Sequence, residues 1–533
     1  MSEQNQAVDE ETGKLLEFLC GAGQRPPFNS TMHEAVRHEL YSFYTRANEE
    51  GASRPEDPGQ ATHIARFFEK LVEIKNEKGF FADQLGFDRK ELTRLALRHI
   101  QLDEHGVSVA GRVFSSPGHI KKVLRLVEHY QKNKKTLAPS GLDKWDAISE
   151  NFGRIQKMLR MNSQDWDSPA GQFKNAIDSL ISLSQVVKLP ESAFVDLMKV
   201  TQRFGLRIPP YFAGLIMSGN SNDPILLQCL PTGESLDPKG ESSPPLCATR
   251  SPARLVDRIY PFTAAIKATV ICPVHCAHCV RREHIPAKDF SFSLQAYNEA
   301  LAYIRKNKEI RDVLITGGDP LMLSDKVVHY LLTELDKIDH VEIKRIGTRV
   351  PTVLPQRISD QLLAVLGRSN EQKPLRLMTH INSAMEITPV SLAALKKLSR
   401  VTSAILNQSV LLRGVNDSSP AMWRLCETLQ QAYVKPHYLF AMSPRHPDQA
   451  YLKVPISNGR DIVEGMIGVL PGDAIPRFMA LAGGKVPLER CLATRVEDDQ
   501  FLLSKPWSGL DEKYPDVSQE DYAKKDFGFA RYK

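Results

Sequence analysis

The 533-residue chain has few cysteines, little net charge and no long apolar run, and each shortage excludes a class of protein. Eight cysteines are too sparse for the disulfide framework of a small secreted protein. The net charge of +6 is small for this length, and no basic stripe interleaved with aromatics supports nucleic-acid binding. No window reaches roughly 18 uninterrupted apolar residues, so no membrane-spanning helix is expected. The polar, acidic start MSEQNQAVDEETGK differs from a secretory signal, and we expect a cytoplasmic protein.

The first half of the chain has helical texture without a catalytic motif. Residues 1–160 carry apolar side chains at helical spacing and predict an all-helical accessory or oligomerisation domain, with helices expected at 11–20, 63–78 and 120–134. Residues 161–255 continue with two expected helices in 173–205 and then a linker rich in Pro, Gly and Ser.

From residue 263 the pattern changes to alternating strands and helices, which predicts an α/β fold. We expect strands at 264–271, 312–316, 341–347, 375–381, 402–412 and 437–442. Helical patterns separate them, at 293–306, 325–338, 359–366, 389–399 and 421–431. Six such alternations predict a parallel, partial (β/α)6 barrel over 256–450, followed by a C-terminal segment over 451–533. In such barrels the chemistry gathers at the C-terminal ends of the strands.

Three of the eight cysteines lie within eight residues, directly after the first expected strand. Cys272, Cys276 and Cys279 have C-x3-C-x2-C spacing, which can supply three thiolates to a [4Fe–4S] cubane and leave the fourth iron open. The alternative is a zinc site that takes His275 or His278 as its fourth ligand.

A second motif, Ile-Thr-Gly-Gly-Asp-Pro, follows the second expected strand. Gly317 and Gly318 allow the backbone to approach a ligand closely, and Asp319 with nearby carbonyls could receive an ammonium group. Alone, these residues are typical of an ordinary strand-to-helix turn.

Together these blocks resemble the lysine 2,3-aminomutase family of radical S-adenosylmethionine (SAM) enzymes, over roughly residues 165–505. The resemblance rests on blocks that occur in the family's order: RIPPYFAGLI, NDPILLQCLPTG, CPVHCAHCVRRE, ITGGDPLMLSD, RIGTRVPTVLPQRI, THINSAMEITP, NQSVLLRGVND and GGK. Residues 1–160 lie outside it.

The resemblance implies a radical SAM barrel with three cofactors: a [4Fe–4S] cluster, SAM and pyridoxal 5′-phosphate (PLP). The reduced cluster would cleave SAM to a radical that takes hydrogen from C3 of an amino acid. PLP would then carry the amino group from C2 to C3, giving a β-amino acid. A flavodoxin or ferredoxin would supply the electron, and a homo-oligomer is possible.

The resemblance also implies roles for single residues. Lys485 would attach PLP, and Arg281 would grip the substrate carboxylate with its planar fork. Arg258 matches a family arginine on the PLP phosphate; a second such arginine is missing, and Lys267 could stand in. His380 and Asn382 are expected on the SAM side.

The substrate side departs from lysine-specific members of the family. They hold the distal ammonium of lysine with two aspartates, whereas Ser443 aligns with one position and the segment before Lys485 has no acid. We therefore expect an acidic or neutral substrate first and a basic substrate such as arginine second. A basic substrate would need a new carboxylate, which Asp448 could supply by folding inward. Arg445 beside the gap favours an acidic side chain.

Two other activities stay open at this stage. One is a radical SAM/PLP lyase or deaminase on the same scaffold. Two departures from the family suggest it: the second phosphate arginine is missing, and the glycine run before Lys485 is shorter. The other is a non-catalytic iron–sulfur sensor, which would not need Arg281, Asp319 and Lys485 together. The family's subunit-linking zinc site is expected to be absent, because Ser418 follows Asp417 where that site has a cysteine.

Overall fold

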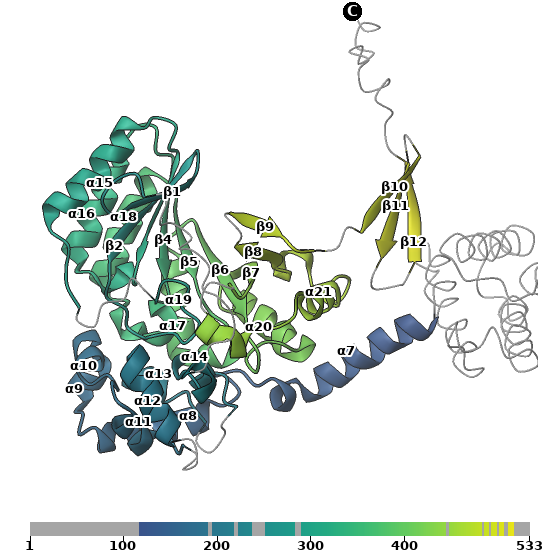
Figure 1. The fold of residues 1–533 in the computed structure, drawn as a ribbon, viewed down its shortest axis with the longest axis horizontal. Helices are drawn as coiled ribbons and strands as arrows, with labels where there is room; N and C mark the ends of the chain where they lie inside the picture. Colours follow the sequence, from purple (N-terminus) through teal and green to yellow (C-terminus); the bar gives the residue numbers. More distant parts are fainter. Residues whose placement is uncertain are drawn as a thin grey trace, which may run out of the picture. The chain divides into compact units, whose positions relative to one another are not determined.

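The computed structural model describes residues 117–189, 194–217, 222–236, 251–282, 289–443, 447–481, 484–489, 492–497, 500–505 and 510–515. The chain divides into two compact units, and Lys132–Arg490 form the larger one (Figure 1). The helices expected at 11–20 and 63–78 lie outside the described residues, whereas the one expected at 120–134 is confirmed within α7 (Pro117–Leu137).

A curled nine-stranded sheet forms the centre of the larger unit, with its strands in sequence order from β1 to β9. Strands β2 to β8 are parallel, and β1 and β9 pair antiparallel at the two edges. The strands are β1 (Val256–Tyr260), β2 (Thr263–Thr269), β3 (Asp312–Gly317), β4 (Ile343–Thr348), β5 (Leu375–Thr379), β6 (Ala404–Leu411), β7 (Lys435–Ala441), β8 (Arg477–Leu481) and β9 (Lys485–Pro487).

All six expected strands are confirmed, as β2 to β7. The sheet differs from the expectation at its end, because β8 adds a seventh parallel strand and β9 an edge strand beyond residue 450. The barrel therefore includes the segment with Lys485, which places that residue on the same sheet as the cysteine loop.

Helices on the outer side connect the parallel strands. They are α15 (Leu294–Lys306), α16 (Asp325–Asp336), α17 (Val350–Val353), α18 (Asp360–Gln372), α19 (Pro389–Ser399), α20 (Ser419–Gln431) and α21 (Ile456–Glu464), with short 3-10 turns η5 (Pro320–Met322), η6 (Pro355–Arg357), η7 (Ala384–Glu386), η8 (Pro447–Leu452) and η9 (Gly472–Ala474).

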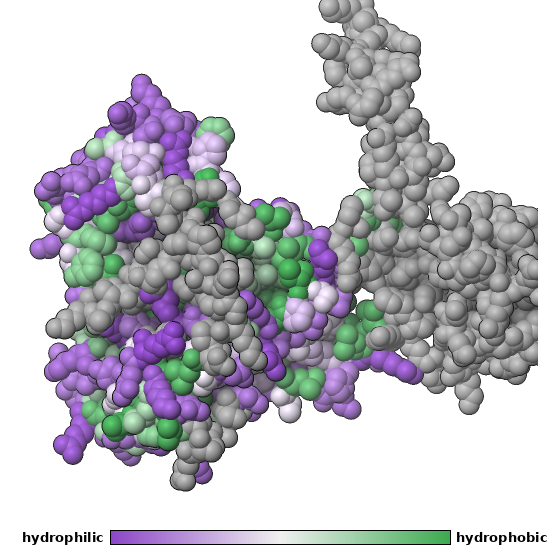
Figure 2. All heavy atoms as spheres, in the orientation of Figure 1, coloured by the Kyte–Doolittle hydropathy of each residue, from purple (hydrophilic) through white to green (hydrophobic). Residues whose placement is uncertain are grey.

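Helix α15 illustrates why these segments fold as they do. The Ser293 side chain accepts the backbone N–H of Ala296, which caps the helix start. Tyr297, Leu301 and Ile304 recur at helical spacing and are buried against the sheet. Hydrophilic side chains cover the outward side of α15 and α16 in Figure 2.

A helical segment packs against the cysteine-loop side of the barrel. It contains α8 (Trp145–Met158), α9 (Ser163–Asp167), α10 (Pro169–Lys174), α11 (Leu180–Val186), α12 (Phe194–Phe204), α13 (Pro210–Ala213), α14 (Leu226–Cys229) and η3 (Gly233–Leu236). Its buried side chains, among them Ile148 and Phe212, form one hydrophobic core with Val274, Val353 and Met385 of the barrel loops. This segment thus fixes the loop that carries the cysteines.

The smaller unit contains a separate antiparallel sheet of β10 (Ala493–Glu497), β11 (Gln500–Lys505) and β12 (Leu510–Pro515). Within the part of the chain that the structure describes, no helix is long and apolar enough to cross a membrane.

Candidate active site

A cavity of about 650 Å³ opens at the C-terminal ends of the parallel strands. The ends of β2, β3, β4, β5, β6 and β7 all contribute to its wall, as a barrel site predicts. The three motif cysteines and Lys485 line the same cavity, although more than 200 residues separate them in the chain.

The cysteine loop follows β2 and is held by backbone contacts to the helical segment. The N–H of His275 donates to the carbonyl of Arg207 (2.9 Å), and that of Ala277 to the carbonyl of Gln228 (2.8 Å). Burial raises the pKa of Cys279 to about 11 and raises that of Cys272 as well. Thiols in such surroundings need nearby positive charge, such as bound iron, to become thiolates.

Among the described residues, no three His, Cys, Asp or Glu side chains are gathered as a site for one metal ion. The assignment of Cys272, Cys276 and Cys279 to a cluster therefore rests on their spacing, their common cavity and the family.

The glycine pair makes room for the neighbouring strand. Gly317 has φ of +127°, and a Cβ there would lie 2.2 Å from the carbonyl oxygen of Thr269. A Cβ on Gly318 would lie 2.4 Å from the carbonyl oxygen of Ile271. The two glycines thus let the end of β3 pack against the backbone that leads into the cysteine loop, and both also line the cavity.

The Asp319 carboxylate is buried and already accepts four hydrogen bonds. One oxygen accepts from the N–H of Leu321 (3.1 Å) and the hydroxyl of Thr348 (2.8 Å). The other accepts from the N–H groups of Arg349 (2.7 Å) and Val350 (3.2 Å). These bonds tie the ends of β3 and β4 together, and Asp319 also lines the cavity. That this carboxylate and the carbonyls beside it receive an ammonium group stays a prediction.

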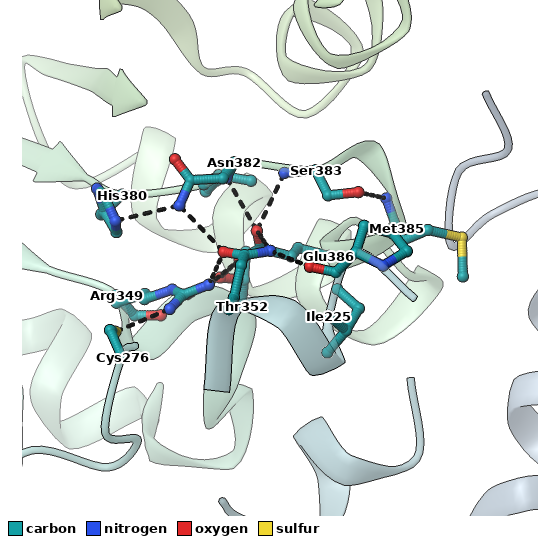
Figure 3. Close-up of polar contacts among 12 residues, drawn as sticks. Ile225, Cys276, Arg349, Thr352, His380, Asn382, Ser383, Met385 and Glu386 are labelled. Carbon is teal, nitrogen blue, oxygen red and sulfur yellow. Dashed lines mark hydrogen bonds and ion pairs between the residues drawn. The ribbon is translucent and has the colours of Figure 1, made fainter. Parts of the chain in front are cut away.

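His380 lines the cavity, whereas Asn382 is fully buried and is not among the lining residues. Figure 3 shows the two side chains in contact. The Nδ1–H of His380 donates to the carbonyl of Gln408 (2.8 Å), so its Nε2 accepts from Nε2–H of His278 (2.7 Å). Burial lowers the pKa of His380 to about 4, which keeps the ring neutral. The Asn382 amide donates to Gln228 and His380, so Asn382 positions the wall and does not face a ligand.

Arg281 faces the cavity beside the cysteine loop. Its guanidinium donates to the hydroxyl of Thr316 at the end of β3 (2.6 Å). This places a planar cation between the cysteine loop and the strand ends, where it can bind a carboxylate.

Arg258 is not among the residues that line the cavity, so the structure gives no support to its expected role at the PLP phosphate. Alternation along β1 turns Asp257 and Ile259 inward and Arg258 outward. There its guanidinium pairs with Glu309 (2.7 Å) and donates to Asn307 and the carbonyl of Pro261. These contacts anchor the β1–β2 hairpin.

Two cations that do face the cavity at this end are Lys267 of β2 and Arg345 of β4. Lys267 pairs with Asp257 (2.9 Å), and Arg345 pairs with Asp312 (2.6 Å). The sequence offered Lys267 only as a substitute, and Arg345 lay unassigned within a family block.

Lys485 begins β9 and projects over an aromatic ring. Its backbone N–H donates to the hydroxyl of Tyr260 (2.7 Å), and its ammonium lies 4.8 Å from the centre of the Tyr438 ring. Burial, together with the positive charge of Arg345, lowers the pKa of Lys485. A lysine in these surroundings loses its proton readily and can react with an aldehyde.

The wall near the expected substrate side chain carries Met442, Ser443 and Leu481, and none of these three is an acid. Asp448 pairs with Arg282, so it does not turn inward to receive a basic substrate. Arg445 lies outside the described residues.

Comparisons with known proteins agree with this geometry. Residues 266–422 match the radical SAM superfamily. The chain is 33% identical over 409 residues to the glutamate 2,3-aminomutase of Clostridioides difficile, covering 75% of this chain and 94% of that protein. It is 34% identical over 355 residues to the L-lysine 2,3-aminomutase of Clostridium subterminale, covering 66% and 84%.

A third relative also matches this chain. The L-lysine 2,3-aminomutase of Bacillus subtilis is 31% identical over 379 residues, covering 70% of this chain and 79% of that protein. The family's cofactors are a [4Fe–4S] cluster, SAM and PLP. From the cavity that joins three cysteines to a lysine on one barrel, and from these matches, we conclude that the chain belongs to the 2,3-aminomutase family of radical SAM enzymes.

Proposed function

We propose that this protein is a PLP-dependent amino-acid 2,3-aminomutase whose substrate has an acidic or neutral side chain. The observation that carries the proposal is one cavity lined by Cys272, Cys276 and Cys279 and also by Lys485, whose pKa is lowered. A radical source and an amine carrier must both reach one small substrate, and this arrangement brings their attachment points into one cavity.

The residues at the Lys485 end fit PLP. The lowered pKa of Lys485 makes its amine available for attachment, and the Tyr438 ring gives it an apolar support. Lys267 and Arg345, which line the cavity as Arg258 does not, supply positive charge for a phosphate.

The residues at the cysteine end fit a three-thiolate cluster with one open iron. When bound, the cluster and SAM supply the radical that removes hydrogen from C3, and PLP supplies the π-system for amino-group migration. The backbone carbonyls around Gly317 and Gly318 can accept hydrogen bonds from the amino group of SAM. Electrons come from an external donor of the flavodoxin or ferredoxin type.

Arg281 orients the substrate. Its guanidinium lies beside the cysteine loop and donates to Thr316 at the end of β3, so it would bind the substrate carboxylate there and fix the direction in which the substrate lies in the cavity. A lysine in its place would lose the two-point contact that fixes the direction of the substrate.

The described cavity wall supports a substrate without a distal cation. Its acids, Asp257 and Asp319, are engaged by Lys267 and by four hydrogen-bond donors, and Asp448 is engaged by Arg282. A distal ammonium beside Met442, Ser443 and Leu481 would meet no carboxylate among those three side chains. Burying such an unpaired charge costs roughly several kcal/mol. The name of the Clostridioides difficile relative, a glutamate 2,3-aminomutase, agrees with this ranking.

The test is an anaerobic assay of the reconstituted protein with SAM, PLP, a reductant and single amino acids. Glutamate, aspartate, alanine, glutamine, lysine and arginine are compared, and β-amino acids and 5′-deoxyadenosine are followed by mass spectrometry. We expect a β-amino acid from an acidic or neutral substrate and at least tenfold less turnover of lysine.

The matched controls are Lys485→Ala, which should abolish the β-amino acid, and Lys396→Ala, an exposed lysine of α19 that should leave it unchanged. A product that has lost nitrogen would establish a lyase or deaminase. Preferred turnover of lysine or arginine would overturn the substrate class.

A further inference from the structure

A buried arginine, Arg349, lines the cavity beside the cysteine loop and reaches one of the motif sulfurs. It follows β4, and its side chain is 6% exposed. One guanidinium nitrogen donates to Sγ of Cys276 at 2.9 Å (Figure 3). Arg349 stands outside the cysteine motif and 73 residues further along the chain.

Besides Cys276, the guanidinium has one acidic and one neutral hydrogen-bond partner. Its other terminal nitrogen pairs with Glu386 (3.1 Å) and donates to the side-chain oxygen of Gln228. The guanidinium carbon lies 5.3 Å from the centre of the Phe212 ring. The backbone of Arg349 is fixed by Asp319, so both ends of the residue are constrained.

Glu386 is fully buried and is itself fixed by a set of donors. One oxygen accepts from the N–H groups of Asn382 (2.9 Å) and Ser383 (3.1 Å), and the other from the hydroxyl of Thr352 (3.3 Å). Because these donors fix the Glu386 carboxylate, it can keep the Arg349 guanidinium in place when the sulfur of Cys276 shifts.

The hydrogen bond from Arg349 to Cys276 is weak when the sulfur is a neutral thiol, since a thiol is a weak acceptor. The same contact is strong when the sulfur carries negative charge as a ligand of iron. Reduction adds one electron to the cluster, and a nearby donor to sulfur stabilises the added negative charge. Removing this donor should therefore make the cluster harder to reduce.

We propose that Arg349 is a positioning residue that raises the reduction potential of the cluster through its hydrogen bond to Cys276 Sγ. This inference rests on the proposed function, because it requires the cluster. Arg349 does not replace a ligand: it holds the middle cysteine and adds a fixed positive charge beside it.

The test is a potentiometric titration of the reconstituted full-length protein, in which the reduced cluster is quantified by electron paramagnetic resonance. We expect Arg349→Gln to lower the ratio of reduced to oxidised cluster at least tenfold at a fixed potential, a shift of about 59 mV for a one-electron couple. Arg349→Lys keeps the charge and should recover part of the shift.

Arg207→Gln is the matched control for losing a nearby charge. Arg207 donates to the backbone carbonyl of Cys272 and pairs with Asp289, so it neutralises no sulfur directly. Its loss should shift the potential by less than half as much. An Arg349→Gln protein that holds a full cluster at the wild-type potential would overturn the inference and leave the proposed function standing.

A measurement on the wild-type protein covers the case in which the variants do not fold. Pulsed electron paramagnetic resonance of protein grown with isotopically labelled arginine should detect nitrogen coupled to the reduced cluster through Cys276. An absence of coupling would overturn the inference, whereas a wild-type protein without iron and sulfide would overturn the proposed function with it.

Discussion

Replacing Asp319 by asparagine tests whether this carboxylate is a structural clamp between β3 and β4. The carboxylate is 4% exposed and accepts from Leu321, Thr348, Arg349 and Val350. An asparagine amide has one acceptor oxygen. In its better orientation it still accepts from Arg349 and Val350 and donates to the Thr348 hydroxyl.

The N–H of Leu321 then has no acceptor, and two charge-assisted hydrogen bonds become neutral ones. An unsatisfied buried donor costs about 1–3 kcal/mol, and each weakened bond about 0.5–1 kcal/mol more. Removing a buried charge offsets part of this. We expect Asp319→Asn to lower the free energy of unfolding by about 2–4 kcal/mol.

The assay is urea denaturation of the metal-free protein, with Asp360→Asn as the matched control. The Asp360 side chain is 93% exposed, so its replacement should change stability by less than about 0.5 kcal/mol. If Asp319→Asn changed stability as little as the control did, while SAM binding fell sharply, the carboxylate would be a ligand and the clamp would be refuted.

Three further predictions concern the cavity. Gly317→Ala forces a Cβ against the Thr269 carbonyl at positive φ, so we expect a loss of roughly 2–4 kcal/mol in stability by urea denaturation and a lower iron content. Lys267→Gln should weaken PLP binding about tenfold, measured by absorbance titration, because a charge-assisted contact is lost, whereas Arg258→Gln should leave it unchanged. Arg345→Met removes a positive charge that lowers the pKa of Lys485, so the Lys485 ammonium persists to higher pH. The pH of half-maximal PLP attachment should therefore rise, and an unchanged midpoint would contradict this.

The sequence predicts the barrel well because its parallel strands are buried. Runs such as 264–271 and 312–316 are mostly apolar, and intervening segments such as 421–431 have helical spacing, so local pattern and global fold agree. The short strand Arg477–Leu481 was missed because the connection before it combines the 3-10 turns η8 and η9 with only a nine-residue helix, α21.

The site was predicted where residues are adjacent in sequence and less well where they meet across the fold. The cysteines and glycines form local motifs, and both motifs line the cavity. Three of the four partners of Asp319 lie about 30 residues further on, and the side-chain partners of Arg349 lie in three other segments, so no local pattern indicates them. The outward position of Arg258 depends on the pairing of β1 with β2, which is irregular between Asp257 and Tyr260, so the local sequence does not indicate it.

The most direct test of the central claim is quantification of iron, sulfide and zinc in protein purified without oxygen. The account predicts one [4Fe–4S] cluster per chain, and its loss in Cys276→Ser. Zinc in place of iron, or a wild-type chain with neither iron nor sulfide, would contradict it.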